Sequence, residues 1–399
     1  MSKRKIINDP IYGLITFPDE IIYDFIDHSF FQRLRRISQM GLSTYVYPGA
    51  NHSRFSHALG ALHLMTTALD ILKSKDVNIT GDEYTGACLA ILLHDIGHGP
   101  FSHALEHVLV EKDHETISLD IMHALNNEFK GKLNTAISIF NGSYPKKFLT
   151  QLVSSQLDMD RMDYLTRDSY YSGVAEGVIG YKRIVSMLNV ADDELVVEEK
   201  GIFSIEKFIV ARYIMYWQVY LHKTSLASEQ MLKSFVLRFK YLVKENPEFI
   251  EECRLKTYFD NINKGKINKE NYLEHFLTLD DIDIYSSLKI NRISSDPIIK
   301  ILSNGILDRR LFKVIIENSP LNSDLIESIR QKVAIKYKLD DQTVDQLLIQ
   351  GQESSKAYDN IHEEIKILSK NGTVEPISGH LDVLVNVQQI TKYYICYPC

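Results

Sequence analysis

Several features that would place this chain in other protein classes are scarce or missing. It has only four cysteines, too few and too scattered for a disulfide framework. No apolar run approaches the roughly 18 residues that span a bilayer, and the N-terminus lacks the apolar segment of a secretion signal. A net charge of −7 argues against broad nucleic-acid binding. We therefore expect a cytoplasmic protein that uses neither a membrane nor a nucleic acid as its main partner.

The residues that are present suit a large, mainly helical fold. The 399 residues can bury a sizeable core, and the content of 45% hydrophobic and 24% charged residues is typical of globular proteins. Helical periodicity dominates, while short β-like runs indicate small hairpins. We predict a mainly α fold with small β-hairpins and a smaller C-terminal α/β lobe. The predicted units are residues 1–190, 191–330 and 331–399.

Several local elements can be predicted from turn residues and periodicity. A hairpin is expected within residues 1–17, a second within 195–205 turning at Lys200–Gly201, and a helix from Ser102 to Val110. The C-terminal lobe is inferred from the following features: Val333–Leu339, Val383–Val387, Tyr393–Cys396 and a turn at Asn371–Gly372. Cys396 and Cys399 form a Cys-Tyr-Pro-Cys sequence that lacks a second cysteine pair, so we interpret it as incidental.

The most informative stretch is Leu92-Leu-His-Asp-Ile-Gly-His-Gly-Pro-Phe-Ser-His103. The apolar run before it predicts a buried helix, which Gly97, Gly99 and Pro100 would end or kink. Imidazole and carboxylate ligands together suit a borderline divalent ion such as Mn, Fe, Zn or Ni. The alternative is a set of ordinary core or surface histidines. Clustering favours a metal site, because nine of the fourteen histidines fall within 72 residues: His52, His57, His63, His94, His98, His103, His107, His114 and His123.

Three further patterns place charged or titratable groups near one another. Arg54 and His57 lie three apart at a helix start, where an anion can bind. His103 and Glu106 are also three apart, so the carboxylate can orient the imidazole for general acid or base chemistry. Within 157–168, a helix would align one tyrosine between two carboxylates, with Arg161 beside them; the alternative is a charged surface face. The aligned residues are Asp160, Tyr164 and Asp168.

Six motifs, in the same order, resemble those of HD-domain phosphohydrolases, most closely the dNTP triphosphohydrolases. The resemblance runs from about residue 5 to residue 223. The motifs are Asn8-Asp-Pro-Ile-Tyr-Gly13, Phe31-Gln-Arg-Leu-Arg35, Tyr47-Pro-Gly-Ala50 with Arg54-Phe-Ser-His57, His94 to His103, Asp160-Arg-Met-Asp-Tyr164 with Arg167-Asp168, and Tyr220-Leu-His-Lys223. The resemblance implies an HD-domain helical core in residues 1–190 and a helical extension that completes the active site.

The resemblance also assigns roles to residues. It implies that one divalent metal binds to His57, His94, Asp95 and Asp160. It places His98 and His103 at the phosphates, with Glu106 supporting the catalytic histidine. The implied substrate-binding residues are Gln39, Arg54, Arg161, Tyr164, Asp168, Arg212 and Tyr220. An activating nucleotide, GTP or a dNTP, is implied at Lys5, Asn8, Asp27, Gln32, Arg35, Arg183 and Lys200. Gly180 and Glu198 depart from the family pattern, which weakens the case for a second activating nucleotide.

The implied reaction is metal-dependent hydrolysis of dNTPs to a deoxynucleoside and tripolyphosphate. A metal would polarise the α-phosphate and arginines would offset developing charge, with Mg accompanying the nucleotide phosphates. The resemblance further implies a homo-oligomer, a dimer or tetramer, regulated by nucleotides. Two alternatives remain open from the sequence: an HD-domain hydrolase for another nucleotide phosphoester, or a non-catalytic nucleotide sensor.

Overall fold

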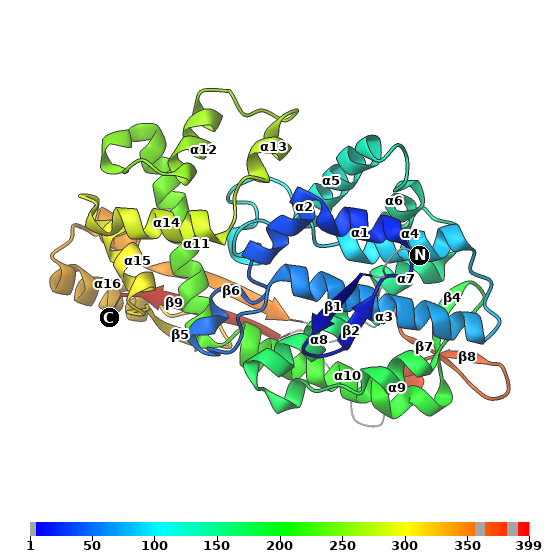
Figure 1. Cartoon of the computed structure of the whole chain (residues 1–399). Coiled ribbons are helices and arrows are strands. Elements are labelled where there is room, and N and C mark those ends of the chain that lie inside the picture. Colours follow the sequence, from blue (N-terminus) through cyan, green and yellow to red (C-terminus); the bar gives the residue numbers. More distant parts are fainter. Residues whose placement is uncertain (1–4, 356–363, 381–389, 399) are drawn as a thin grey trace.

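Helices make up most of the computed structural model, which describes residues 5–355, 364–380 and 390–398 (Figure 1). The predicted mainly α fold is confirmed. The α-helices are α1 (Glu20–Asp27), α2 (Ser29–Gln32), α3 (Arg54–Ser74), α4 (Gly81–Leu93), α5 (His114–Glu128), α6 (Asn134–Phe140), α7 (Lys147–Val153), α8 (Met159–Ser172), α9 (Tyr181–Ser186), α10 (Ile202–Met215), α11 (Lys223–Glu245), α12 (Arg254–Asn263), α13 (Tyr272–Phe276), α14 (Asp281–Ile290), α15 (Pro297–Leu307), α16 (Ser323–Tyr337) and α17 (Asp341–Asp345). Among the described residues, none of these helices is long and apolar enough to cross a membrane.

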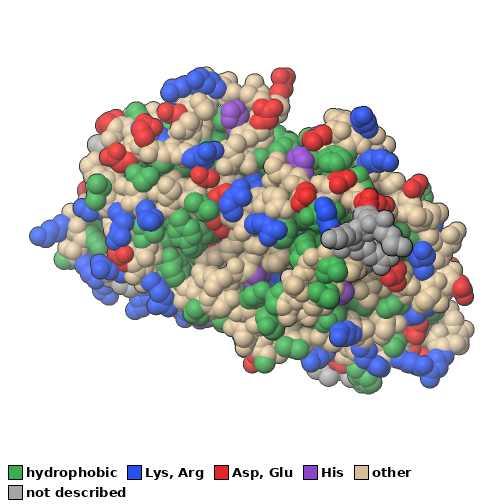
Figure 2. All heavy atoms as spheres, viewed as in Figure 1, with side chains coloured by type: hydrophobic (Ala, Val, Ile, Leu, Met, Phe, Trp, Pro, Cys, Tyr) green, Lys and Arg blue, Asp and Glu red, His purple; other side chains and the backbone are tan. Residues whose placement is uncertain are grey.

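In the part of the chain that the structure describes, the strands are short and form three small sheets. They are β1 (Ile6–Asp9), β2 (Gly13–Thr16), β3 (Leu188–Ala191), β4 (Glu194–Glu198), β5 (Lys313–Glu317), β6 (Ile349–Ser355), β7 (Lys366–Leu368), β8 (Val374–Pro376) and β9 (Ile390–Tyr397). The sheet orders are β1-β2, β3-β4-β7-β8 and β5-β9-β6. The face shown in Figure 2 mixes basic with acidic side chains.

Helices α3, α4 and α8 form the centre of the molecule, and α3 packs against the other two. Helix α4 begins with a capping box, in which Thr80 and Glu83 each accept the other's backbone N–H. Its last seven residues are buried, and it ends at Leu93, just before the glycines and proline that were expected to stop it. The end of α4 therefore opens beside the first turns of α3 and α8.

The N-terminal hairpin predicted from the sequence is confirmed. Strands β1 and β2 pair antiparallel from Ile6 opposite Thr16 to Asp9 opposite Gly13. The Asp9 carboxylate accepts the N–H groups of Ile11 and Tyr12, at 2.9 and 3.1 Å, and so closes the turn. Asp9 is buried, which ties this exposed hairpin to the core.

Two local predictions are wrong. The hairpin near 195–205 is instead formed by β3 and β4, and it turns at Asp192–Asp193, where both residues have positive φ angles of 49° and 64°. Aspartate tolerates this conformation, which two-residue hairpin turns require. Lys200–Gly201 belongs to a 3₁₀ turn that opens α10. The predicted helix Ser102–Val110 is only a 3₁₀ turn, Ser102–Leu105, because Glu106 leaves the helical conformation with ψ 139° and His107 is left-handed with φ 61°.

The C-terminal lobe combines helices with a sheet, as predicted, and Val333–Leu339 begins inside α16. A small core forms where Ile329, Val333, Val344 and Leu348 pack with Ile395 of β9. The Asn371–Gly372 turn joins β7 to β8, with Gly372 at φ 89°, whereas Val383–Val387 lies outside the described residues.

The later chain also contributes to sheets that begin earlier in the sequence. Strand β7 pairs parallel with β4, and β9 pairs with β5, whose residues precede 331. Figure 1 shows the two sheets at opposite ends of the molecule. The boundaries at 190 and 330 stay predictions.

Candidate active site

Three metal-ligand side chains meet where the ends of α3, α4 and α8 converge. The Nε2 atom of His57 lies 3.1 Å from Asp160 Oδ1 and 3.4 Å from Nε2 of His94. His94 Nε2 is 3.5 Å from the same Asp160 oxygen. Each residue thus offers one ligand atom, and these atoms all lie within 4.8 Å of one another. This spacing lets the three side chains bind one ion.

Asp95 borders this cluster. Its Oδ1 lies 3.4 Å from His94 Nε2, and its Oδ2 lies 3.6 Å from His57 Nε2. The Arg54 guanidinium contacts Asp95 Oδ2 and also donates from Nε to Ser102 Oγ at 2.6 Å. Burial raises the pKa of Asp95, but the charge of Arg54, together with the neighbouring His94 and His98, outweighs burial and holds that pKa well below its ordinary range. The structure therefore brings together the four residues to which the resemblance assigns the metal.

The hydrogen-bond partners of the two histidine rings show which ring nitrogen is available to a metal. His57 Nδ1 lies 2.8 Å from Asp163 Oδ2, and His94 Nδ1 lies 2.6 Å from the Ile91 carbonyl oxygen. Both rings therefore present Nε2 to the cluster, the arrangement usual for metal-bound histidines. Burial lowers the pKa of His57, but hydrogen bonds to Asp160 and Asp163 raise it overall, to about 10. The donor set of imidazoles and carboxylates fits a borderline divalent metal.

Asp163 is itself held by a buried ion-pair chain. Arg167 donates to both oxygens of Asp163, at 2.9 and 3.0 Å, and to Asp9 at 2.9 Å. Gly60 makes room for this chain, because a Cβ there would lie 1.9 Å from Asp163 Oδ1. Sequence reasoning did not assign Asp163 a role, although its i,i+4 spacing to Arg167 was a visible signal.

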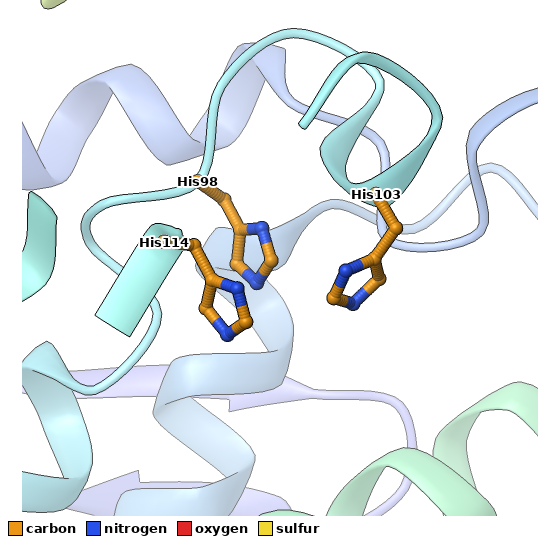
Figure 3. A group of neighbouring side chains, drawn as sticks. All are labelled: His98, His103 and His114. Atoms are coloured by element: carbon orange, nitrogen blue, oxygen red, sulfur yellow. The ribbon is translucent and has the colours of Figure 1, made fainter. Parts of the chain in front are cut away.

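A second cluster contains His98, His103 and His114 (Figure 3). The rings of His98 and His114 are stacked 3.9 Å apart, and His103 lies across from them. Glu106 joins two of the rings, with Oε2 2.9 Å from His103 Nδ1 and Oε1 2.7 Å from His114 Nδ1. These hydrogen bonds hold the pKa of Glu106 well below its ordinary range, so the carboxylate is ionised and fixes both imidazoles.

The two clusters are adjacent, because His98 Nε2 lies 3.3 Å from Asp95 Oδ1. Burial and the charge of Arg54 lower the pKa of His98 well below its ordinary value, so this ring is neutral. The side chain of His103 is 67% exposed and can reach a bound molecule. Sequence reasoning missed His114, which lies eleven residues after His103 and beyond an irregular turn that no periodic pattern predicts.

Further along α8, a buried carboxylate faces two hydrogen-bonding partners. Asp168 accepts from the Tyr220 hydroxyl at 2.6 Å, and its other oxygen lies 2.7 Å from His52 Nε2. The Tyr164 and Tyr220 rings approach edge to face at 6.3 Å. His52 was not assigned a role from the sequence; its only signal was membership of the histidine cluster. Its ring stacks on Tyr171 at 4.5 Å.

The remaining predicted substrate-binding residues lie around this part of α8. The Arg161 guanidinium contacts Asp158, and Arg212 donates to Gln156 Oε1 at 3.0 Å. Burial raises the pKa of Tyr164 to about 12, and the charges of Arg212 and Arg161 oppose this rise. The Gln39 N–H donates to the His52 carbonyl at 3.1 Å.

Five of the residues assigned to an activating nucleotide lie near the N-terminal hairpin and α1. Lys5 pairs with Asp27 at 3.9 Å, and Gln32 accepts from Arg35 Nε at 2.8 Å. Gln32 also donates to the carbonyl of Ile26 at 2.8 Å, and Ile26 is the residue before Asp27, so the two pairs lie close together. All but Gln32 are exposed, so the cationic and polar groups face solvent.

The fifth residue, Asn8, is exposed on β1. Arg183 and Lys200 form a separate exposed pair, in which Arg183 donates to the Lys200 carbonyl at 2.9 Å. Glu198, the residue that departs from the family pattern, pairs with Lys75 at 2.7 Å.

Comparisons with known proteins identify the class of this fold and site. The HD domain model matches residues 54–168, and the model of the HD associated region matches residues 179–246. A crystal structure of a phosphohydrolase from Bacteroides thetaiotaomicron is 44% identical, covers 100% of both chains and has a TM-score of 0.94.

Two curated relatives extend the comparison. The Bacillus subtilis protein YwfO is 31% identical over 100% of this chain and 93% of its own length. The deoxynucleoside triphosphate triphosphohydrolase SAMHD1 of Mus musculus is 28% identical over 97% of this chain and 66% of its own length. The chain belongs to the HD-domain phosphohydrolase family that includes the SAMHD1 enzymes and their bacterial homologues.

Proposed function

We propose that this HD-domain protein hydrolyses deoxynucleoside triphosphates to a deoxynucleoside and tripolyphosphate, using one divalent metal. The observation that carries the proposal is the order of groups along one face of α8. Asp160 belongs to the metal cluster, Tyr164 follows one turn later, and Asp168 follows after another turn. Eight residues of helix span about 12 Å, so a nucleotide with its phosphates at Asp160 would bring its sugar toward Asp168.

The metal would be held by His57, His94, Asp95 and Asp160. It would polarise the substrate phosphate as a Lewis acid. His98 and Arg54, which border the metal cluster, would contact the phosphate oxygens, and Arg161 and Arg212 would offset charge on the chain. In this assignment, four residues bind the metal and the three arginines surround the substrate phosphates.

His103 would act as the general acid. Glu106 holds its Nδ1, so Nε2 is the nitrogen that can donate a proton to the 5′-oxygen of the nucleoside. Water attacks the α-phosphorus, the bond from phosphorus to the 5′-oxygen breaks, and the proton from His103 neutralises the leaving alkoxide. The products are therefore the deoxynucleoside and tripolyphosphate, and the proton lost by water restores His103.

The sugar would be recognised by Asp168, which is buried and can accept a hydrogen bond from the 3′-hydroxyl. Tyr164 and Tyr220 pack beside it and would leave little room for a 2′-hydroxyl. Beside these rings, the extra 2′-hydroxyl of an NTP would be buried without a hydrogen-bond partner, which costs free energy. We therefore propose a preference for dNTPs over NTPs.

The test is product analysis of the purified protein with each dNTP and Mn²⁺, with and without GTP, by ion-exchange chromatography. Asp95→Ala should abolish turnover, whereas Asp24→Ala, an exposed change on α1, should not. Release of monophosphate and pyrophosphate would place cleavage at a different bond. No turnover under any metal or nucleotide would favour a nucleotide sensor.

We also propose that bound nucleotides regulate dNTP hydrolysis. The residue group around Lys5 and Arg35 and the Arg183–Lys200 pair are exposed cationic surfaces that can bind GTP or a dNTP, and a dimer or tetramer would bring such surfaces together. Stimulation of dNTP hydrolysis by GTP, together with a change in sedimentation, would support this proposal. Constant activity and constant mass across GTP concentrations would contradict it.

A further inference from the structure

The chain that follows α4 delivers His98 and His103 to the second cluster. We call residues 97–103 the HD loop. Phe101 and Ser102 have φ angles of 53° and 52°, in the left-handed region that residues with a Cβ rarely adopt. Two consecutive residues of this kind persist only where the surrounding structure holds them. His103 follows directly, so the contacts that hold Phe101 and Ser102 also set the direction of its side chain.

One such contact comes from a distant part of the chain. Asp281, buried in the first turn of α14, accepts the Phe101 N–H with Oδ1 at 2.7 Å. Its other oxygen, Oδ2, accepts the Ser38 N–H at 2.8 Å. The Phe101 ring also contacts Tyr285 of α14, edge to face at 5.3 Å. A single carboxylate therefore ties the HD loop to the segment around Ser38, near the 3₁₀ turn Arg33–Arg36.

The other end of the HD loop is held by Arg33, which is also buried. Its Nη2 donates to the His98 carbonyl at 2.8 Å, and its Nε donates to the Leu279 carbonyl at 2.9 Å. Leu279 lies two residues before Asp281. Arg33, residues 279–281 and the HD loop therefore form a closed ring of contacts, in which the two charged side chains hold backbone groups at both ends of the loop.

We propose that Asp281 and Arg33 are positioning residues that hold the HD loop in the conformation in which His98 and His103 face the substrate phosphates. This inference rests on the proposed function for its kinetic consequence. Neither residue reaches the substrate; each acts through backbone hydrogen bonds to the loop. The segment from Leu279 into α14 is thereby part of the active-site framework.

The cost of keeping a charge at position 281 supports a role beyond stability. Burial raises the pKa of Asp281 to about 6, despite its two backbone hydrogen bonds and despite nearby Arg33. A side chain selected only for packing would avoid that burial cost. The anionic carboxylate offers two acceptors, whereas an amide offers one acceptor and would present N–H groups to a backbone N–H.

The decisive variant is Asp281→Asn, which keeps the size of the side chain and removes one acceptor. We expect kcat for dNTP hydrolysis to fall by about 10- to 100-fold, as small misplacements of catalytic groups do, while KM and bound metal stay within about twofold of wild type. Hydrogen exchange measured by mass spectrometry should become faster in peptides covering the HD loop and Ser38, and stay unchanged in α3 and α8.

The matched control is Asp296→Asn. Asp296 is also buried, caps α15 by accepting the Ile299 N–H at 2.9 Å, and pairs with Arg238. It does not touch the HD loop in the described structure, so this variant should lose stability while it keeps the kcat of its folded fraction. If Asp281→Asn does not fold, Arg33→Lys, which keeps the charge but has fewer donors, is tested by the same criteria.

An unchanged kcat in the folded variant would overturn the proposal. So would a fall in activity that only follows the folded fraction, as in the Asp296→Asn control. Failure of the proposed function is distinguishable, because wild type would then release no tripolyphosphate while the exchange measurement still reports whether Asp281 holds the loop.

Discussion

The two histidine clusters lie side by side but are built in different ways. His57, His94 and Asp160 lie in or next to the ends of α3, α4 and α8, and buried partners fix the rings of both histidines. His98 and His103 stand on irregular chain whose backbone includes left-handed residues, whereas His114 is the first residue of α5. The support of this cluster comes from Glu106, Arg33 and Asp281. In the first cluster, helix ends carry the ligands, and Asp163 of α8 also orients His57 of α3. In the second cluster, the HD loop that carries His98 and His103 is held by Arg33 and Asp281, which lie far from it in the sequence.

The largest expected difference between the clusters is in metal binding. His94→Ala should lose bound metal and all detectable dNTP hydrolysis. His103→Ala should keep the metal and lose about 10²- to 10⁴-fold in kcat, the range typical of a missing general acid. Elemental analysis of the purified variants beside their kcat values checks both. Loss of metal from His103→Ala would show that the clusters are not functionally separate.

A smaller effect is expected when the second cluster loses its shared carboxylate. In Glu106→Gln, one side-chain oxygen replaces an ionised carboxylate that now meets both His103 and His114. We expect kcat to fall by about 10- to 100-fold with metal content unchanged, by analogy with other losses of supporting partners. Glu115→Gln, an exposed change at the start of α5, is the control. Equal activity of the two variants would contradict the role of Glu106.

In the first cluster, loss of the supporting carboxylate of Asp163 should weaken metal binding, but the site should still fill when metal is in excess. Asp163→Asn weakens the hydrogen bond to His57 and the pair with Arg167. Metal affinity should fall by about 10- to 100-fold, and excess metal should restore most of the activity. Titration of the metal-free protein by calorimetry measures the affinity. An unaltered affinity would mean that the Asp163 network supports only the fold.

A separate effect, on stability rather than on activity, concerns the support of the second cluster. Burial raises the pKa of Asp281 from the ordinary 3.8 to about 6; Asp280 adds to the rise, while Arg33 and the N–H groups of Phe101 and Ser38 oppose it. Because the folded state binds this proton more tightly, the stabilisation is complete below about pH 4 and is lost as pH rises through about 6. That shift corresponds to about 3 kcal/mol.

Asp281→Asn lacks this titration. The free energy of unfolding of the variant, relative to wild type, should therefore rise by about 2.5 kcal/mol between about pH 4 and pH 7. Urea denaturation at the two pH values measures the difference. A relative stability that is the same at both would show that Asp281 titrates normally and bears no unusual burial cost.

The same contrast explains what the sequence could and could not predict. The ligands and the α8 stripe follow local rules: a buried run stopped by glycine and proline predicts where α4 ends, and i,i+4 spacing predicts which residues share a face. The roles assigned to them stay predictions. Ser102–Val110 was wrongly predicted as helix, because periodicity cannot register the left-handed residues Phe101, Ser102 and His107.

Long-range contacts account for what sequence reasoning missed. His114 reaches the second cluster across an irregular turn, and Asp281 reaches the HD loop from 180 residues away. Neither lies in a motif, and no spacing rule relates either residue to its partner. The hairpin near residue 195 was misplaced for a related reason, since two aspartates rather than a glycine supply its positive φ angles.

Hydrolysis of a dNTP in ¹⁸O-labelled water, followed by ³¹P NMR and mass spectrometry of the products, tests the central claim most directly. Attack at the α-phosphorus predicts one ¹⁸O atom in the tripolyphosphate and none in the deoxynucleoside, with no product from His94→Ala. Label in the deoxynucleoside, or release of monophosphate with pyrophosphate, would contradict the account.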